Sequence, residues 1–397
     1  MIMFYLFDNV IHKDIMSIFL DGCNNWIEFK NSYKANTFKS SLCSLAIEYG
    51  FTGNIWQSFL IYSLMFNDNA YTRSIERNIN ASTFNLVDFD LETYYKMYTY
   101  KLDLQEIENF DYCTRTTDIS KIVNEIKNDI KDINTFKSSI LNFYKTKGLA
   151  DMAIYKAFRV EDGVLSPIYN VLDVSFNDLI GYDYQKSLLI ENTECFINGK
   201  PCNNVLLYGE SGTGKSTSIK ALLNTYYAAG LRIIEVYKHQ MEEISKIIHT
   251  LRARPYHYII YMDDLSFEED EIEYKYLKSI IEGGIEPKPN NVVIYATSNR
   301  RHLIKETSID NLADDLHRNE TQAEKLSLAY RFGLQIYYSS LSPKEFRAMV
   351  KELANKNDIK VEESILIQEA SKWELKYGSL SGRCAAQFIS YLVNKYQ

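Results

Sequence analysis

The chain has 397 residues, a hydrophobic content of 46% and a formal net charge of −8 at pH 7. This length allows two or three folded domains. The acidic charge argues against a protein that coats DNA or RNA through bulk electrostatics, although it leaves room for a local basic patch that contacts nucleic acid.

Cysteine spacing and apolar runs bear on the compartment. The six cysteines lie far apart and include no C-x-x-C pair, which indicates free thiols in a reducing environment. No apolar run is long enough to span a membrane, and the first residues lack the basic start of a signal peptide. We therefore expect a cytoplasmic protein without a membrane partner.

The first 164 residues contain no proline, which favours a helical array. The clearest helical pattern is an apolar stripe formed by Ile119, Ile122, Val123, Ile126, Ile130 and Ile133. Tyrosine and phenylalanine crowd this region, and such aromatics are more typical of a core than of a ligand site. Glu161-Asp162-Gly163 and Ser166-Pro167 predict a linker, so we expect a helical N-terminal domain of unreadable role over residues 1–165.

Residues 203 to 217 form the most informative stretch. Gly209, Gly214, Lys215 and Ser216 fit the pattern G-x-x-x-x-G-K-[ST], between an apolar strand and a helix-forming segment. Such a loop points backbone N–H groups at phosphate oxygens. The predicted contacts are Gly209, Glu210, Ser211, Gly212, Thr213, Gly214, Lys215, Ser216 and Thr217, with Lys215 on the β- and γ-phosphates and the Ser216 hydroxyl on Mg²⁺. A chance glycine turn would not need this strand–loop–helix setting.

Strands and helices alternate after this loop, which predicts a mainly parallel α/β sheet with its ligand at the carboxyl ends of the strands. The predicted strands are residues 205–208, 232–237, 257–262, 291–297 and 334–338. Asp263 and Asp264 end the third strand, where a buried carboxylate needs a positive partner. We assign Asp263 to Mg²⁺; capping of the next helix is the competing interpretation. The acidic run 268–271 fits a solvated helix start.

Three further polar features follow. Asn299, at the tip of the fourth strand, can hold an attacking water against a γ-phosphate. Ser342-Pro343-Lys344-Glu345 is a capping box that opens about three helices. Arg383 lies in the first turn of the last of these helices, where it opposes the helix dipole, so it is placed for an anion rather than for helix stability.

Taken in order, these motifs resemble an AAA+ ATPase and, more closely, a family of bacterial AAA+ proteins known as a domain of unknown function. The core also resembles that of the bacterial replication initiator. The likeness covers residues 174–397 and leaves the N-terminal region outside. The residues that carry it are Ile180 to Tyr182, Glu191 to Glu194, Asn203 to Ser216, Asp263 to Glu268, Glu282 to Gly284, Ala296 to Leu303, Glu324 to Leu328 and Arg331 to Gly333.

The resemblance implies a five-stranded nucleotide-binding domain over residues 166–340 and a helical lid over residues 341–397. Its cofactors would be ATP and Mg²⁺, with Ile180, Gly181 and Tyr182 against adenine. Asn299 and Arg383 match the first and second sensors. Arg331 matches the arginine finger, which acts in a neighbouring subunit and so implies a homo-oligomer; the alternative is that Arg331 pairs with a local carboxylate such as Glu324.

One position departs from many AAA+ proteins. The residue after the metal aspartate is Asp264 rather than the glutamate that polarises water, so hydrolysis would be slow, with Glu268 as a helper. We expect an ATPase that remodels or loads a partner protein. The alternative is a nucleotide-gated binding module that recruits a partner through the N-terminal domain. Lys238-His239-Gln240 replaces the aromatic-apolar-glycine loop of protein-threading rings, and a small-molecule kinase would need neither Arg331 nor the lid.

Overall fold

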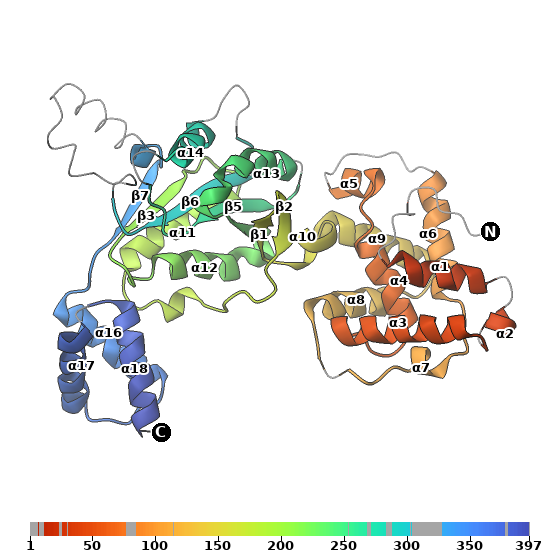
Figure 1. Cartoon of the computed structure of the whole chain (residues 1–397), viewed down its shortest axis with the longest axis horizontal. Helices are drawn as coiled ribbons and strands as arrows, with labels where there is room; N and C mark the ends of the chain where they lie inside the picture. The colour runs from red at the N-terminus through yellow and green to blue at the C-terminus, as the bar shows by residue number, and fades with distance from the viewer. Residues whose placement is uncertain are drawn as a thin grey trace. The chain divides into compact units, whose positions relative to one another are not determined.

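The computed structural model describes residues 7, 12–23, 26–29, 31–76, 85–113, 115–252, 254–267, 271–282, 288–301, 303, 328–377 and 380–396. The chain divides into two compact units, Met1–Tyr155 and Lys156–Gln397. Figure 1 shows that the described secondary structure of the first unit is helical and that the second contains the sheet.

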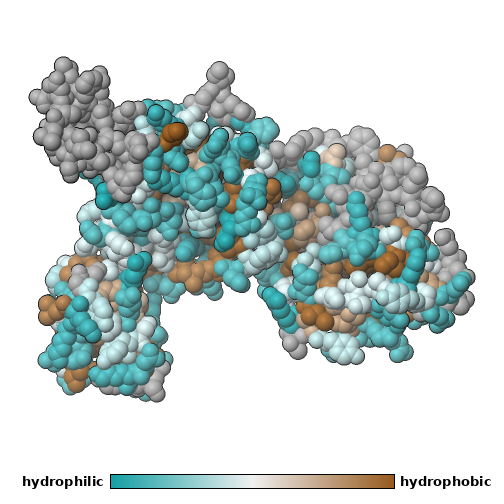
Figure 2. Space-filling model, in the orientation of Figure 1, coloured by the Kyte–Doolittle hydropathy of each residue, from teal (hydrophilic) through white to brown (hydrophobic). Residues whose placement is uncertain are grey.

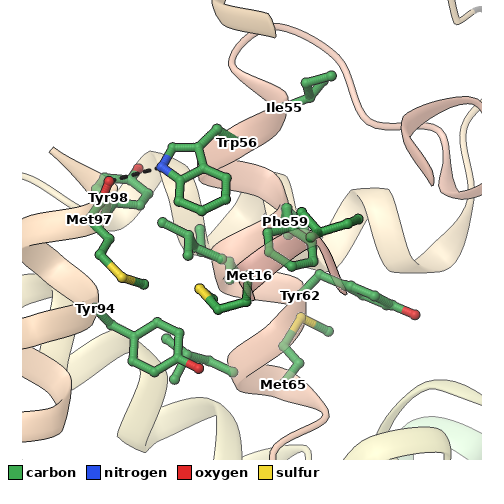
Figure 3. Close-up of a cluster of buried hydrophobic side chains, with 14 of the residues drawn as sticks. Met16, Ile55, Trp56, Phe59, Tyr62, Met65, Tyr94, Met97 and Tyr98 are labelled. Atoms are coloured by element: carbon green, nitrogen blue, oxygen red, sulfur yellow. Dashed lines mark hydrogen bonds between the residues drawn. The ribbon is translucent and has the colours of Figure 1, made fainter. Parts of the chain in front are cut away.

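The first unit is built around helix α4 (Ile55–Met65), whose residues are all buried apart from the half-buried Gln57. Trp56 is fully buried, and its indole Nε1 donates a hydrogen bond to the carbonyl of Met97 at 3.0 Å (Figure 3). Phe19 packs on this indole with ring centroids 4.4 Å apart. The other helices are α1 (Lys13–Gly22), α2 (Trp26–Phe29), α3 (Tyr33–Tyr49), α5 (Ala70–Glu76), α6 (Asn85–Tyr98), α7 (Gln105–Glu108), α8 (Asp118–Asp129), α9 (Ile133–Thr146) and α10 (Ala150–Ile154).

The apolar stripe from Ile119 to Ile133 belongs to two helices rather than one. Helix α8 ends at Asp129, and Asp132 caps α9 by accepting a hydrogen bond from the N–H of Thr135. An aspartate side chain competes for backbone N–H groups in this way, so it starts a new helix instead of extending the old one.

The second unit holds a seven-stranded sheet in the order β2-β1-β4-β5-β6-β3-β7. Every neighbouring pair is parallel except β1 and β2. The mainly parallel α/β fold predicted from the sequence is confirmed, with two additional strands. The strands are β1 (Ala157–Glu161), β2 (Val164–Pro167), β3 (Val205–Gly209), β4 (Leu231–Glu235), β5 (His257–Met262), β6 (Val292–Ser298) and β7 (Leu334–Tyr338).

The linker predicted over residues 161–167 is wrong. These residues form the β1–β2 hairpin, and β1 pairs in parallel with β4, so the unit boundary lies at Tyr155 instead of near residue 165. The turn consists of Asp162 and Gly163, with φ angles of 51° and 74°. An Asp-Gly pair with two positive φ angles is the usual turn of a tight hairpin, and it joins strands as readily as it ends a domain.

Helices cover both faces of the sheet (Figure 1). On one face α11 (Asp183–Ile197) and α12 (Lys215–Tyr226) pack on alternate strand residues such as Ile259 and Tyr261 of β5 and Val293 and Tyr295 of β6. On the other face lie α13 (Ile244–Leu251) and α14 (Glu273–Glu282). Short 3₁₀ turns are η1 (Phe176–Asp178), η2 (Tyr227–Ala229) and η3 (Lys238–Glu243).

Three helices follow β7, as the sequence predicts: α16 (Pro343–Lys356), α17 (Glu363–Tyr377) and α18 (Gly382–Tyr396). They enclose a separate apolar cluster that includes Phe346, Met349 and Phe388. Ser342 forms the predicted capping box with Glu345.

The surface of the described residues is largely hydrophilic on the face shown in Figure 2, with small apolar groups between. No helix in that part of the chain is both long and apolar enough to cross a membrane. All six cysteines are free, as predicted.

Candidate nucleotide-binding site

The loop between β3 and α12 begins at Gly209, which has a φ of 135°. A Cβ atom at this position would lie 2.0 Å from the carbonyl oxygen of Tyr338 on the neighbouring strand β7. Only glycine fits both the backbone angle and this close approach. The chain can therefore turn sharply at the carboxyl end of β3 and enter α12 at Lys215.

Lys215 is buried, and its Nζ donates hydrogen bonds to the carbonyls of Gly209 and Glu210, both at 2.7 Å. A third bond, of 3.2 Å, reaches Oδ1 of Asn299 at the end of β6. Burial lowers the pKa of Lys215, while the carboxylates of Asp264 and Asp263 act in the opposite direction. The ammonium thus lies at the centre of the loop, with acceptors on several sides.

Asp263 follows β5, on the face that packs against α12, because it continues the alternation of Ile259 and Tyr261. Its Oδ1 accepts a hydrogen bond of 2.7 Å from the Ser216 hydroxyl. The same oxygen accepts one of 2.5 Å from the hydroxyl of Thr297. Burial acts to raise the pKa of Asp263, but side-chain hydrogen bonds, with those from Thr297 and Ser216 first, and the nearby charge of Lys220 hold the pKa below its ordinary value.

Asp264 has a φ of 50°, a left-handed conformation that aspartate tolerates better than most residues. Its carboxylate Oδ1 accepts a hydrogen bond of 2.6 Å from Nδ2 of Asn299. Asn299 thus connects Lys215 on one side with Asp264 on the other. The expected helper, Glu268, lies outside the residues that the structure describes.

These groups line a cavity of about 590 Å³. The phosphate loop contributes Ser211, Gly212, Thr213, Gly214, Lys215, Ser216 and Thr217, and the strand ends contribute Asp263, Asp264, Thr297 and Asn299. The rest of the wall is formed by Asp178, Leu179, Ile180 and Tyr182 and by Met349, Leu353, Gly382, Arg383 and Ala386 of the C-terminal helices. Of the predicted contacts, Gly181, Gly209 and Glu210 do not line this cavity; the last two line a neighbouring pocket.

Two hydrogen bonds hold the walls of the cavity, one from the C-terminal helices and one from the segment before α11. The backbone N–H of Arg383 donates to the carbonyl of Gly212 at 3.1 Å, and a Cβ atom on Gly212 would come within 2.9 Å of the Cβ of Arg383. The Tyr182 hydroxyl donates to the carbonyl of Ser339, between β7 and α16, at 2.8 Å. The C-terminal helices are therefore tied to the phosphate loop, and the segment before α11 is tied to the segment that follows β7.

Arg331 lies away from this cavity. Its Nε donates to Oε1 of Glu282 at 2.5 Å. Strand β7 pairs in parallel with β3, from Leu334 opposite Val205 to Tyr338 opposite Gly209. Arg331 precedes β7, so it lies near the amino-terminal ends of β3 and β7, whereas the phosphate loop lies at the carboxyl end of β3. Glu324, the predicted local partner, lies outside the described residues.

The residues present fit a phosphate chain with Mg²⁺. Lys215 and the Arg383 side chain bring positive charge to the cavity, and the loop supplies the start of an α-helix. Ser216 and Asp263 place a hydroxyl and a carboxylate 2.7 Å apart, and oxygen ligands are those that Mg²⁺ prefers. The remaining ligands of such an ion would come from phosphates and water.

Sequence patterns missed several residues of the site. Thr297 contacts both aspartates; it lies within the stretch that carries the resemblance, but the sequence assigned it no role. Its position two residues before Asn299 places it on the same face, which is a signal that strand periodicity could have provided. Met349, Leu353 and Ala386 reach the cavity only through the packing of the C-terminal helices, which no local pattern encodes.

Comparison with known proteins places the chain in a family. Residues 151–396, more than half of the chain, match the family model described as "Protein of unknown function (DUF815)". The chain belongs to the DUF815 family. The match begins just before the second unit of this DUF815 protein and covers its sheet, its phosphate loop and its C-terminal helices. The mainly parallel sheet and the glycine loop between β3 and α12 give this DUF815 member an α/β fold of the P-loop kind.

Two further comparisons are more distant. A 76-residue segment, 19% of this chain, is 34% identical to the replication factor C large subunit of Methanococcus maripaludis, and it spans only 16% of that protein. The RuvB Holliday junction branch migration motor of Thermotoga maritima is 16% identical, with a TM-score of 0.33 over 55% of this chain and 71% of RuvB. A point variant of the same RuvB gives a TM-score of 0.34 at 15% identity, with the same shares of the two chains covered.

Proposed function

We propose that this DUF815 protein is an AAA+ ATPase that binds and hydrolyses ATP at subunit interfaces and uses the cycle to remodel or load a partner protein. One observation carries the proposal: a single cavity is lined together by Lys215, Ser216, Asp263, Asp264 and Asn299. A loop that binds phosphates without chemistry would not require the second aspartate and the amide beside it.

Each of these side chains has a role that its geometry allows. Lys215 binds the β- and γ-phosphates, and Ser216 and Asp263 hold Mg²⁺. When bound, Mg²⁺ neutralises charge on those phosphates. Asp264 accepts a proton from the attacking water. Asn299 hydrogen-bonds to the Asp264 carboxylate and orients this carboxylate and the water.

Arg331 acts in the site of a neighbouring subunit. From Val205 to Gly209, strand β3 spans about 13 Å at ~3.3 Å per residue, and Arg331 lies beyond the far end of the paired strand β7. A guanidinium in this position can serve a second copy more readily than its own loop. Glu282, the partner of Arg331 in the ion pair, has a side chain that is 45% exposed, so water can solvate its carboxylate when the arginine leaves.

One observation favours a second candidate, a slowly hydrolysing, nucleotide-gated module that recruits its partner through the helical N-terminal unit. Oδ1 of Asp264 accepts a 2.6 Å hydrogen bond from Asn299. A lone pair that is engaged in this bond cannot at the same time accept a proton from water, so one oxygen of the carboxylate is partly occupied. Slow turnover would leave ATP bound for long enough to act as a switch.

The two candidates are separated by measuring ATP affinity in equilibrium titration and phosphate release in steady state on the same full-length protein. Tight binding with turnover that rises when copies assemble supports the ATPase. Tight binding with turnover far below the roughly 1 per second at the low end of typical enzymes supports the switch. A protein that binds no ATP at all excludes both. Affinity capture with the Asp264→Asn protein held on ATP would then identify the partner.

A further inference from the structure

The hydroxyl of Thr297 contacts both aspartates at once. Its Oγ1 donates to Oδ1 of Asp263 at 2.5 Å and accepts a hydrogen bond from the backbone N–H of Asp264 at 2.9 Å. Thr297 is only 1% exposed, near the end of β6. Ser216 bonds to the first aspartate and Asn299 to the second, whereas Thr297 bonds to both. One hydroxyl therefore links the predicted metal ligand to the backbone of the predicted base.

The two hydrogen bonds of the Thr297 hydroxyl act on different groups: one orients the Asp263 carboxylate, and the other holds the Asp264 backbone. Oδ1 of Asp263 also accepts a hydrogen bond from the Ser216 hydroxyl, which lies in the first turn of α12, directly after the phosphate loop. The bond from Thr297 comes from the adjacent strand, so it orients the carboxylate independently of the loop. A hydroxyl has one proton to donate and two lone pairs, so it can hold Asp263 and Asp264 together.

The backbone of Asp264 needs such support. Its φ of 50° is a left-handed conformation that residues with a side chain adopt rarely, although aspartate does so more readily than most. Strain of this kind persists where neighbouring groups hold the backbone in place. The Asp264 N–H on the Thr297 hydroxyl and the Leu265 N–H on the Thr297 carbonyl, at 2.7 Å, hold the backbone on both sides of Asp264. This conformation directs the carboxylate of Asp264 to Asn299.

We infer that Thr297 is a positioning residue, which orients Asp263 for Mg²⁺ and Asp264 for water through its single hydroxyl. The inference rests on the proposed function, because it names the residue that sets the geometry of the same site. Thr297 orients the two aspartates and does not itself contact the phosphates. Its loss should therefore weaken what Mg²⁺ adds to ATP binding and should slow turnover, while ATP binding without Mg²⁺ stays unchanged.

Two substitutions separate the hydroxyl from the shape of the side chain. Thr297→Val keeps the branched shape and the backbone bond from Leu265 but removes the hydroxyl. Thr297→Ser keeps the hydroxyl. The matched control is Thr193→Val in α11, since Thr193 is also fully buried and bonds through its hydroxyl to the Leu189 carbonyl and Tyr295, away from the cavity lining.

The measurements are the dissociation constant of ATP with Mg²⁺ and with EDTA, and steady-state phosphate release, all on the full chain. Outer residues that orient metal ligands typically change metal affinity or activity by about 10- to 100-fold. For Thr297→Val we expect a loss of about tenfold or more in the Mg²⁺-dependent gain in ATP affinity, and a similar loss of turnover. Thr297→Ser should recover most of both, and Thr193→Val should change neither.

Three results would overturn the inference. The first is a Thr297→Val protein whose Mg²⁺-dependent gain stays within about twofold of wild type, well below the effect of an orienting residue. The second is an equal loss of ATP affinity with and without Mg²⁺, which would indicate a general disturbance of the fold. The third is a Thr297→Ser protein as impaired as the valine variant. If the wild type binds ATP with Mg²⁺ but does not hydrolyse it, the proposed ATPase fails while the binding readout still tests Thr297.

Discussion

Arg331 and Glu282 form an ion pair in which Nε of the arginine lies 2.5 Å from Oε1 of the glutamate. The pair lies at the end of the strands opposite to the phosphate loop, because Arg331 precedes β7 and β7 runs parallel to β3. The arginine that the resemblance assigns to catalysis is therefore held apart from the loop of its own chain. This separation decides how its role can be tested.

Mixing two inactive variants tests whether Arg331 acts in a neighbouring copy. Arg331→Ala and Lys215→Ala proteins should each lack ATPase activity, since one lacks the guanidinium that stabilises charge on the γ-phosphoryl group and the other lacks the loop lysine. In a random equal mixture, about one interface in four joins an intact finger to an intact loop, so we expect roughly a quarter of the wild-type phosphate release. Arg347→Ala, at an exposed position on α16, is the control for loss of an arginine.

The opposite outcome is equally clear. If the two variants co-assemble, as shown by recovery of the untagged variant with a tagged copy of the other, and the mixture is no more active than its components, then Arg331 does not act across an interface. The arginine would then serve only its local pair with Glu282.

Lys215→Ala should abolish ATP binding. Lys215 is the buried cation within the loop, and its removal leaves no loop side chain with positive charge at the β- and γ-phosphates. Equilibrium titration with a fluorescent ATP analogue measures the effect, and we expect affinity to fall by at least about a hundredfold, because this charge meets two phosphates. Lys246→Ala, an exposed position on α13, should bind as wild type. Undiminished affinity in the Lys215 variant would remove the loop from nucleotide binding.

Asp264→Asn should leave ATP affinity nearly intact while slowing phosphate release by on the order of a hundredfold, the scale of a lost general base. The amide keeps the size of the side chain and one oxygen that can accept from Asn299, so the fold of the strand end should persist. Affinity and turnover are measured on the same preparation. Unchanged turnover would show that another group, such as Glu268, activates water.

Lys127 predicts a pH dependence of stability in the first unit. Its Nζ donates to the Asn54 carbonyl at 3.2 Å and to the Ser58 hydroxyl at 3.0 Å, and burial lowers its pKa to about 8. An unfolded lysine titrates near ~10.4, so between the two values the unfolded chain binds more protons than the folded one. The free energy of unfolding should therefore rise with pH across this window, by about 2–3 kcal/mol.

The comparison protein for this prediction is Lys127→Met, which removes the titrating group and keeps the length of the side chain. Urea denaturation of both full-length proteins at intervals from about pH 7 to about pH 10.5 gives the difference in unfolding free energy, in which other titrating groups cancel. The wild type should gain stability relative to the variant as pH rises. A constant difference would show that Lys127 has an ordinary pKa in the folded protein.

The sequence alone was enough for the core of the second unit. The strand–loop–helix around Lys215, the apolar strands and the aspartates after β5 are local patterns, because phosphate binding and parallel strands each require certain residues at fixed spacing. Local chemistry also indicated the capping box at Ser342 and the free cysteines. For the same reason it failed at Asp162-Gly163, since an Asp-Gly turn reads alike in a linker and in a hairpin.

Only the tertiary structure decided which side chains meet. The pairing of β1 with β4 extends the sheet by two strands, β1 and β2. The register of β5 beside β6 places Thr297 within hydrogen-bonding distance of Asp263 and Asp264. The pairing of Arg331 with Glu282 joins residues far apart in the chain. Such contacts depend on strand order and helix packing, which arise from burial of apolar faces over the whole unit and leave no mark in any short stretch of sequence.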